Sequence, residues 1–317
     1  MSTQTSNQVG KKKRPTNNQI IEEYLDFWES EGSKNTRKSC LNYFFKNKYF
    51  GYNGHIFDVD KRKIMQYFKW LNKKRTIALA TKELKWSIFK SFLDYTLDFY
   101  EDEYDLSIRF PSRFSLSWKK THKKPMSNKN VYMELEEVKE ILDHLKLENF
   151  KYYLIFRIFT ETGMRKGELI GTDYDKVNLE KRYIETTGKT GRKIYYFSRD
   201  IVKYLRVYIK ERKETKADTK ALFLSNRLKR YSKRAFNNYL SRKLEDIGID
   251  KNITCHTFRK SLNNFREEMG CGYEKRCILI NHAIDGVNFS SYVKKDYDKF
   301  IGYYDKWNPY IKNGIKL

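Results

Sequence analysis

The chain has 317 residues, with 65 Lys and Arg against 40 Asp and Glu, a formal net charge of +25 and a pI near 9.6. This length allows two domains with separate cores. The 39% hydrophobic content and the scarcity of Gly and Pro exclude a disordered chain and favour helices. Such a positive excess favours a polyanionic partner, most commonly nucleic acid. The alternative explanation is a general bias of the organism's proteins toward lysine. Such a bias should raise the number of Asp and Glu residues as well, but here they are much fewer than Lys and Arg.

Cysteine usage and hydropathy exclude other classes of protein. The four cysteines lack Cys-x-x-Cys spacing, so they predict reduced thiols instead of a disulfide framework or a zinc site. No apolar run is long enough for a membrane span, and the N-terminus lacks the apolar stretch of a signal peptide. We therefore expect no membrane partner and an intracellular location with the DNA, in the cytoplasm or nucleoid, or in the nucleus of a eukaryotic host.

The first third of the chain predicts a basic arm followed by a helical domain. Residues 1–16 are polar with a Lys-Lys-Lys-Arg run, which predicts a flexible arm lying on phosphates or free in solvent. Residues 17–114 carry apolar and aromatic side chains at helical spacing, which predicts a bundle core within a DNA-binding domain. The lysines expected opposite these stripes, Lys82 and Lys85, are candidates for DNA contact.

Residues 115–132 predict a linker between domains, because they are basic, contain a proline and lack apolar periodicity. The linker either runs beside a duplex or serves as a solubilising loop. The lysines that would contact DNA in the first case are Lys119, Lys120, Lys123 and Lys124.

Residues 133–317 predict a second domain, which is helical except for one hairpin. An apolar stripe over 134–146 predicts a helix, and the apolar run 150–159 predicts a buried helix that ends at Gly163. Residues 182–197 have the pattern of a β-hairpin with Lys189 at its tip. The expected fold is therefore mainly α with a small β-sheet or hairpin in this domain, and a C-terminal tail closes the chain.

Six residues of this second domain carry groups suited to breaking a phosphodiester bond without a metal or another cofactor. Arginine is the natural clamp for phosphate oxygens, tyrosine can form a phosphodiester of its own, and lysine and histidine can move the protons. Each motif alone is common, but all six residue types occur in order on a helix–hairpin–helix framework. They are Arg165, Lys189, His256, Arg259, His282 and Tyr292.

This ordered set resembles the tyrosine recombinase (phage integrase) family. Thr-Gly-Met-Arg165 is similar to the first arginine box of the family, with Glu168 as its supporting acidic residue. His256-Thr-Phe-Arg259 is similar to the second box, and Leu-Ile-Asn-His282 is similar to the family's Leu-Gly-His segment. The resemblance covers roughly residues 134–300, and the tail has some similarity to integrases of archaeal viruses and plasmids.

The resemblance implies a site-specific recombinase that cleaves and rejoins DNA through a 3′-phosphotyrosine and integrates or excises a mobile element. Tyr292 takes the place of the nucleophile, although it lies one residue further from His282 than usual, with Tyr297 as the other candidate. Two domains would clamp duplex DNA. Four protomers would assemble on paired sites, each with the segment after Tyr292 on a neighbour, and the protein would be a monomer off DNA.

Two alternatives remain open from the sequence. Type IB topoisomerases use a similar set of groups, but they act as monomers and relax supercoils without partner sites. A DNA-binding protein that has lost cleavage would need only the charge, and its binding would be sensitive to salt.

Overall fold

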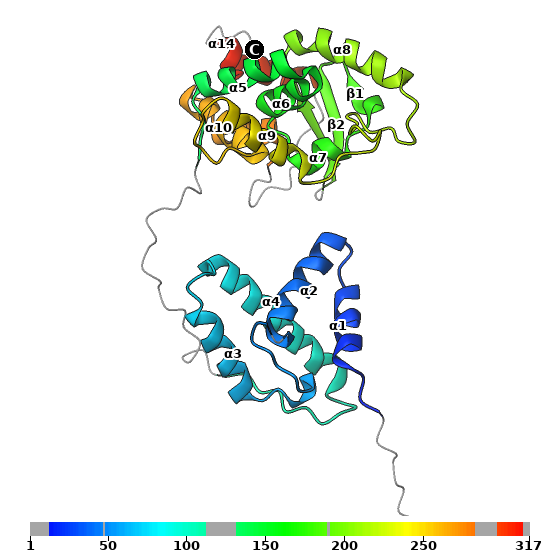
Figure 1. The fold of residues 1–317 in the computed structure, drawn as a ribbon, viewed down its shortest axis with the longest axis vertical. Coiled ribbons are helices and arrows are strands. Elements are labelled where there is room, and N and C mark those ends of the chain that lie inside the picture. The colour runs from blue at the N-terminus through cyan, green and yellow to red at the C-terminus, as the bar shows by residue number, and fades with distance from the viewer. Residues whose placement is uncertain (1–12, 47, 112–130, 189–190, 283–296, 313–317) are drawn as a thin grey trace, which may run out of the picture. The chain divides into compact units, whose positions relative to one another are not determined.

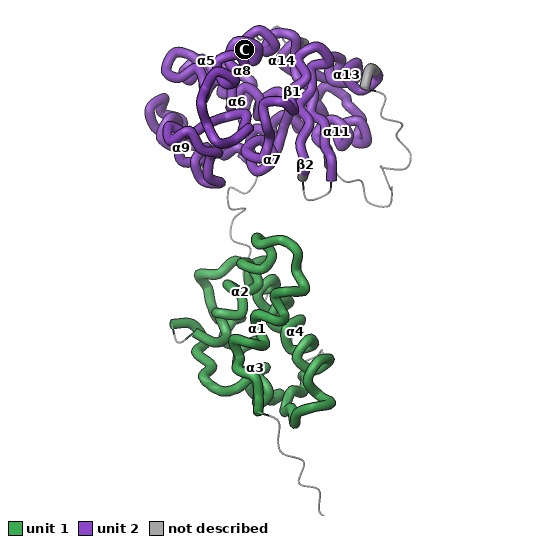
Figure 2. Tube along the Cα trace, turned by 90° about the vertical axis from the view of Figure 1, so that its right-hand side faces the viewer, with its two compact units in different colours: residues 1–126 green, residues 127–317 purple. Residues whose placement is uncertain are grey.

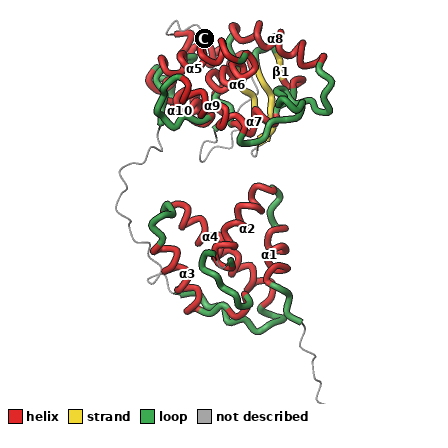
Figure 3. Tube along the Cα trace, in the orientation of Figure 1, coloured by secondary structure: helices red, strands yellow, loops and turns green. Residues whose placement is uncertain are grey.

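The structure is a computed structural model that describes residues 13–46, 48–111, 131–188, 191–282 and 297–312. The chain divides into two compact units, unit 1 (Met1–Met126) and unit 2 (Ser127–Leu317) (Figure 2). Each unit has its own hydrophobic core. Helices dominate both units, and one small antiparallel sheet lies in unit 2 (Figure 3). The predicted fold class is confirmed. None of the helices within the described ranges has both the length and the apolar composition of a membrane span.

Unit 1 is a four-helix bundle with a short 3-10 turn, η1 (Figure 1). Short polar side chains cap the first turn of several of these helices, as Ser30 and Asp60 do by accepting backbone N–H bonds, whereas the helix that begins at Leu79 has no side-chain cap. Aromatic rings fill the core, with the ring centroid of Phe44 lying 4.4 Å from that of Phe89 and 5.1 Å from that of Tyr67. The aromatic stripes are therefore bundle core, as predicted. The elements are α1 (Asn17–Asp26), α2 (Glu31–Phe45), η1 (Ile56–Asp58), α3 (Lys61–Lys73) and α4 (Leu79–Tyr100).

The prediction that Lys82 and Lys85 lie on a solvated face of this bundle is wrong. Lys82 is 1% exposed and its Nζ donates to the Asn72 carbonyl at 2.9 Å, whereas Lys85 is 6% exposed with Nζ 3.3 Å from the Tyr43 ring centroid. Burial lowers the pKa of both ammonium groups. Both long side chains find partners inside the bundle, so neither presents its charge to a phosphate.

Unit 2 is built around the buried helix α6, which contacts α5, α8, α10 and the sheet. The strands run in the order β1-β2-β3, all antiparallel, and Gly188 pairs with Gly191 at the end of the predicted hairpin. Helix α6 ends at Gly163, as predicted. The elements are α5 (Leu135–Glu148), α6 (Phe150–Thr162), α7 (Lys166–Gly171), η3 (Tyr174–Lys176), β1 (Val177–Asn178), β2 (Tyr183–Gly188), β3 (Gly191–Tyr196), α8 (Arg199–Glu214), α9 (Ala235–Asp246), α10 (Cys255–Glu268), α11 (Tyr273–Ile280), α13 (Tyr297–Lys306) and α14 (Pro309–Lys312).

The C-terminal helices α13 and α14 pack on their own unit, against α11 and α10 respectively. The Arg182 guanidinium donates two bonds to the Asp305 carboxylate, at 2.9 and 2.6 Å. Tyr304 is 1% exposed and receives a bond from Asn308 at 2.9 Å. This arrangement differs from the expectation that the segment after Tyr292 lies on a neighbouring protomer, because buried polar partners for this tail exist within the same chain.

A buried carboxylate, Glu161, connects α6 to the tail and to the start of α8. It is 1% exposed and accepts bonds from Arg157 Nε at 2.5 Å, from Ser198 N at 2.7 Å and from Tyr304 Oη at 3.1 Å. Arg157 is also buried and donates a second bond to the Tyr153 hydroxyl at 3.1 Å. Because both charges lie out of water, each depends on the other for stabilisation.

Replacing Glu161 by alanine should therefore leave the Arg157 cation buried and unpaired. We expect the free energy of unfolding of unit 2 to fall by about 3–5 kcal/mol. Urea unfolding of the full chain, followed by circular dichroism, measures this loss. The matched control is Asp143→Ala, whose carboxylate is 47% exposed in a surface pair with Lys139 and should cost less than about 1 kcal/mol. Equal losses in the two variants would contradict the role of the Glu161 network.

Candidate active site

Arg165 lies at the start of α7 and is oriented by Glu168, three residues further on. The Arg165 backbone N–H donates to Glu168 Oε2 at 3.0 Å, and its Nη1 donates to Oε1 at 3.1 Å. Both bonds run from Arg165 to the Glu168 carboxylate, so they hold the first turn of the helix and the Arg165 side chain together. The Arg165 side chain is still 41% exposed, so its guanidinium can meet a ligand.

Glu168 also fixes strand β3 against α7. Its carboxylate, 7% exposed, accepts bonds from Lys193 Nζ and from the Tyr195 hydroxyl, each at 2.6 Å. Burial alone would raise the pKa of Glu168, but these two bonds and the Arg165 backbone bond outweigh burial and hold that pKa below its ordinary value. Sequence reasoning missed Lys193 and Tyr195. Their spacing of two puts them on one face of the strand, but nothing in the sequence pairs that face with Glu168.

Arg259 lies on α10 and reaches the turn just before Arg165. It is 4% exposed, and its Nη1 donates to the Gly163 carbonyl at 2.8 Å. Gly163 has a φ of +63°, and a Cβ there would lie 3.3 Å from Leu262 Cδ2 and 3.6 Å from Arg259 Cγ. The position therefore needs glycine both for its backbone conformation and for the close approach of α10.

The second terminal nitrogen of Arg259, Nη2, is buried and has no hydrogen-bond partner among the described residues. Burial lowers the pKa of this guanidinium, and the nearby Arg165 cation acts in the same direction. A buried donor without a partner is costly in a folded protein, and an anionic ligand would satisfy it.

His256 stands one helical turn before Arg259 on α10 and is exposed. Its pKa is lowered from 6.5, first by partial desolvation and then by the cations of Lys260, Arg259 and Arg165. The imidazole is therefore mostly neutral at neutral pH and can accept a proton or a hydrogen bond. Because Arg165 and Arg259 both lower the pKa of His256, the two guanidinium groups and the imidazole lie in one region of unit 2.

His282 follows the C-terminus of α11, where Asn281 adopts the left-handed conformation with a φ of +51°. The His282 N–H donates to the Cys277 carbonyl at 2.9 Å and the Asn281 N–H to the Ile278 carbonyl at 3.1 Å, which together form a Schellman motif. Asn281 Nδ2 also donates to the Ile194 carbonyl of β3 at 2.7 Å. Asparagine tolerates this backbone conformation, so it can replace the usual glycine and also tie the His282 segment to the hairpin. The His282 side chain is exposed.

The structure thus places Arg165, Arg259 and His256 in one region of unit 2. The bond from Asn281 to Ile194 links the segment that carries His282 to strand β3 of the hairpin. Two predicted site residues, Lys189 and Tyr292, lie outside the described residues, as do the four linker lysines at 119, 120, 123 and 124.

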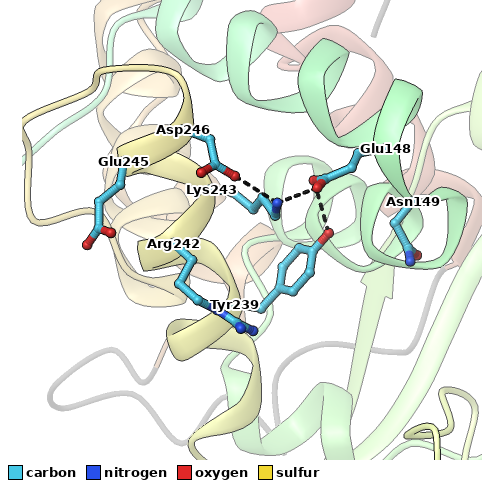
Figure 4. Close-up of a pocket in the computed structure, with 7 residues that line it drawn as sticks. All are labelled: Glu148, Asn149, Tyr239, Arg242, Lys243, Glu245 and Asp246. Atoms are coloured by element: carbon cyan, nitrogen blue, oxygen red, sulfur yellow. Dashed lines mark hydrogen bonds and ion pairs between the residues drawn. The ribbon is translucent and has the colours of Figure 1, made fainter.

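One group of side chains within the described ranges has the composition of a metal site, but an internal cation already lies in it. His144, Glu148 and Asp246 have ligand atoms within 4.8 Å of one another. The Lys243 ammonium lies between the two carboxylates, 2.7 Å from Asp246 Oδ2 and in contact with Glu148 Oε1, and Tyr239 also bonds Glu148 (Figure 4). The ammonium and the carboxylates of this cluster pair with one another and join α5 to α9, so we assign the cluster a structural role.

The chain is similar to known proteins of one family. The profile of the phage integrase family matches residues 131–265. The chain is 25% identical over 237 residues to tyrosine recombinase XerC of Leptospira interrogans, covering 72% of each protein. It is 25% identical over 279 residues to tyrosine recombinase XerD of Staphylococcus saprophyticus, covering 83% of this chain and 90% of that protein.

Two solved structures share the fold. The Tn1549 transposon integrase in complex with a circular intermediate DNA has a TM-score of 0.62 at 14% identity, covering 92% of this chain and 99% of that one. A lambda integrase dimer bound to a COC′ core site has a TM-score of 0.60 at 13% identity, covering 86% and 97%.

On this mainly helical unit, Arg259 is buried with a donor unpaired among the described residues, Arg165 is half exposed, and the pKa of His256 is lowered. The family match over residues 131–265 and the relatives identify a phage integrase family domain in this chain and make it a tyrosine-type site-specific recombinase.

The depressed pKa of Glu168 predicts a pH-dependent contribution to stability. Its ionised form is favoured in the folded state, so the contribution is present above the ordinary pKa of 4.5 and is lost as the pH falls through the lower folded value. Glu168→Gln should cost about 1.5–3 kcal/mol near neutral pH. The difference from the wild type should shrink below pH 4.5.

Urea unfolding across this pH range measures the difference. Glu185→Gln is the control, because it removes a partly exposed carboxylate that pairs with Arg192 on the same sheet. Its cost should stay below about 1 kcal/mol. A difference for Glu168→Gln that stays constant into acid would contradict the predicted pKa shift.

Proposed function

We propose that this recombinase cleaves and rejoins duplex DNA through a transient 3′-phosphotyrosine on Tyr292. The observation that carries the proposal is the pairing of the two arginines around Gly163. Arg259 is held by the Gly163 carbonyl and keeps a buried donor free, and Arg165 follows two residues after that glycine with its guanidinium half exposed.

In this proposal the two guanidinium groups hold the non-bridging oxygens of the scissile phosphate. Negative charge gathers on these oxygens in the pentavalent transition state, and a planar guanidinium that stays protonated can donate two bonds to them. Neither side chain needs to reorganise far, because Glu168 fixes Arg165 and Gly163 fixes Arg259. Donors that are already oriented in a poorly solvated site stabilise such charge most effectively.

The proton transfers follow from the remaining groups. The Tyr292 oxygen attacks phosphorus, its phenolic proton passes to neutral His256, and the bond to the 5′ oxygen breaks. Lys189 gives that leaving oxygen a proton, and His282 donates a hydrogen bond to the phosphate. The reverse steps, with a 5′-hydroxyl from another strand as nucleophile, rejoin the DNA. The lowered pKa of His256 supports its role as acceptor, and the other roles rest on the family resemblance.

The proposed partner is double-stranded DNA, clamped between the two units, with four protomers assembled on paired sites and monomers off DNA. Two observations on known structures support this arrangement. A lambda integrase structure with a TM-score of 0.60 is a tetramer bound to a Holliday junction, and the XerH recombinase, at 0.61, is bound to its difH substrate. We propose integration or excision of a mobile element as the biological role. None of the reported relatives favours a topoisomerase or a non-catalytic binder.

Replacing Tyr292 by phenylalanine should abolish the covalent DNA adduct and leave DNA affinity nearly unchanged, because only the nucleophilic oxygen is removed. The substrate is a supercoiled plasmid carrying the DNA that flanks the gene. The reaction is quenched with SDS, and the DNA-linked peptide is mapped by mass spectrometry. Tyr297→Phe is the matched control and should still form the adduct. An adduct in the Tyr292 variant would show that another residue is the nucleophile.

Replacing Arg165 or Arg259 by lysine should slow cleavage about 10²–10³-fold, because a single ammonium cannot match two oxygens. Single-turnover cleavage under the same conditions gives the rate. Arg206→Lys is the control, since Arg206 is exposed on α8 and should leave the rate unchanged. Cleavage at the wild-type rate by Arg165→Lys would rule out its place in the clamp.

A further inference from the structure

Strand β3 carries a buried tyrosine, Tyr195, that takes no part in the proposed chemical steps. Its side chain is 0% exposed, and its Oη donates to Glu168 Oε2 at 2.6 Å. Burial and the Glu168 charge both raise the pKa of Tyr195, so the hydroxyl stays protonated. A hydroxyl that donates its one proton still has lone pairs with which it can accept a bond from another donor.

The Arg259 guanidinium is that other donor. Burial lowers the pKa of Arg259, and the interaction with Tyr195, which includes a hydrogen bond, acts against burial. In Tyr195, the positive charges of Arg259 and Arg165 act in the direction of a lower pKa and partly offset the effect of burial. The hydroxyl therefore lies close to the Glu168 carboxylate and to both guanidinium groups.

These contacts form a chain that joins both arginines to one carboxylate. Glu168 accepts two bonds directly from Arg165, at 3.0 and 3.1 Å. The Tyr195 hydroxyl joins the same carboxylate to Arg259. Lys193, the other partner of Glu168 on β3, cannot make such a link, because an ammonium donates hydrogen bonds and does not accept them. A hydroxyl between a cation and an anion is polarised by both, which strengthens the two bonds that it makes.

Arg259 needs this second contact to hold its remaining donor in one direction. Its Nη1 bonds the Gly163 carbonyl at 2.8 Å, and its Nη2 is buried without a partner among the described residues. One bond fixes a single point of the guanidinium, whereas a second contact with Tyr195 also fixes its plane. The plane matters, because a guanidinium matches two phosphate oxygens only when its fork faces them.

We propose that Tyr195 is a positioning residue of this recombinase, whose hydroxyl joins Arg259 to Glu168 so that one carboxylate orients both guanidinium groups toward the scissile phosphate. The inference rests on the proposed function, which assigns both groups to that phosphate. Tyr195 touches no reacting atom and transfers no proton. It acts before DNA binds, by holding Arg259 in the orientation that the transition state needs.

The test is Tyr195→Phe, which removes the hydroxyl and keeps the buried ring. The substrate is a duplex cut from the DNA that flanks the gene; strand cleavage in a single turnover gives the rate, and fluorescence anisotropy gives the affinity. The rate should fall about 10–100-fold, the effect of losing one hydrogen bond to a charged group. The Kd should change less than about twofold, because many other phosphate contacts hold the duplex. Equal losses of rate and affinity, or an unchanged rate, would overturn the proposal.

Tyr153→Phe separates positioning from stability. The Tyr153 hydroxyl is also buried, and it accepts a bond from Arg157 Nη1 at 3.1 Å. Its loss should lower the urea midpoint about as much as the loss of the Tyr195 hydroxyl does, but it should leave the cleavage rate unchanged. Similar losses of rate in the two variants would show that cleavage follows stability, which would contradict a positioning role.

A double variant tests the link to Arg259. Tyr195→Phe should slow cleavage less than about threefold when Arg259 is already replaced by lysine, because the guanidinium that the hydroxyl orients is then absent. Independent effects, in which the two losses of rate multiply, would contradict the link.

A measurement without DNA keeps the inference separate from the proposed function. The side-chain N–H signals of Arg259 in NMR spectra, assigned by their absence from Arg259→Lys, should shift and should exchange faster with water in Tyr195→Phe, but not in Tyr153→Phe. Unchanged signals in Tyr195→Phe would overturn the proposal. Absence of cleavage by the wild type, together with the expected change in these signals, would count against the proposed function alone.

Discussion

The arrangement of the catalytic unit depends on the buried carboxylate of Glu168. This single acidic group accepts bonds from Arg165 at the start of α7 and from two side chains of β3, and so fixes the helix, the sheet and Arg165 together. Burying a carboxylate is costly, and here Lys193 and two neutral donors offset the cost. The lowered pKa of Glu168 shows that these bonds outweigh desolvation. The carboxylate therefore stays ionised at neutral pH and holds Arg165 in one orientation without removing it from solvent.

A second buried carboxylate, Glu161 near the end of α6, is also stabilised by hydrogen bonds, but with a different outcome. Arg157, Ser198 and Tyr304 donate hydrogen bonds to the Glu161 carboxylate, so this charge has a structural role. Arg259, by contrast, is buried with one donor unsatisfied. A folded protein keeps such a group only if the surrounding contacts enforce it, and the close approach at Gly163 does so. Among the described residues that donor has no partner, so it is open to a hydrogen-bond acceptor such as the phosphate oxygen of the proposed function.

Much of this could be predicted from the sequence, because the informative signals are local. Helical periodicity, the glycine at the end of α6 and the glycines flanking the hairpin each act within a few residues. The arginine and histidine boxes are recognisable because their order along the chain is characteristic. Contacts that join distant segments could not be predicted: Glu168 with Lys193, Glu161 with Tyr304, and the tail on its own unit. Nor does periodicity reveal that a lysine such as Lys82 buries its long stem and finds a carbonyl partner.

The net charge of the chain does not predict how charge is distributed over its surface. A charge of +25 predicts attraction to DNA, but it says nothing about where the acidic residues gather. In unit 1, Asp94, Asp98, Glu101 and Asp102 all lie exposed on α4 and just after it. Phosphates would be repelled by this part of the surface although the chain as a whole attracts them. The net charge of the chain and the charge of one surface are therefore separate properties, and composition predicts only the first.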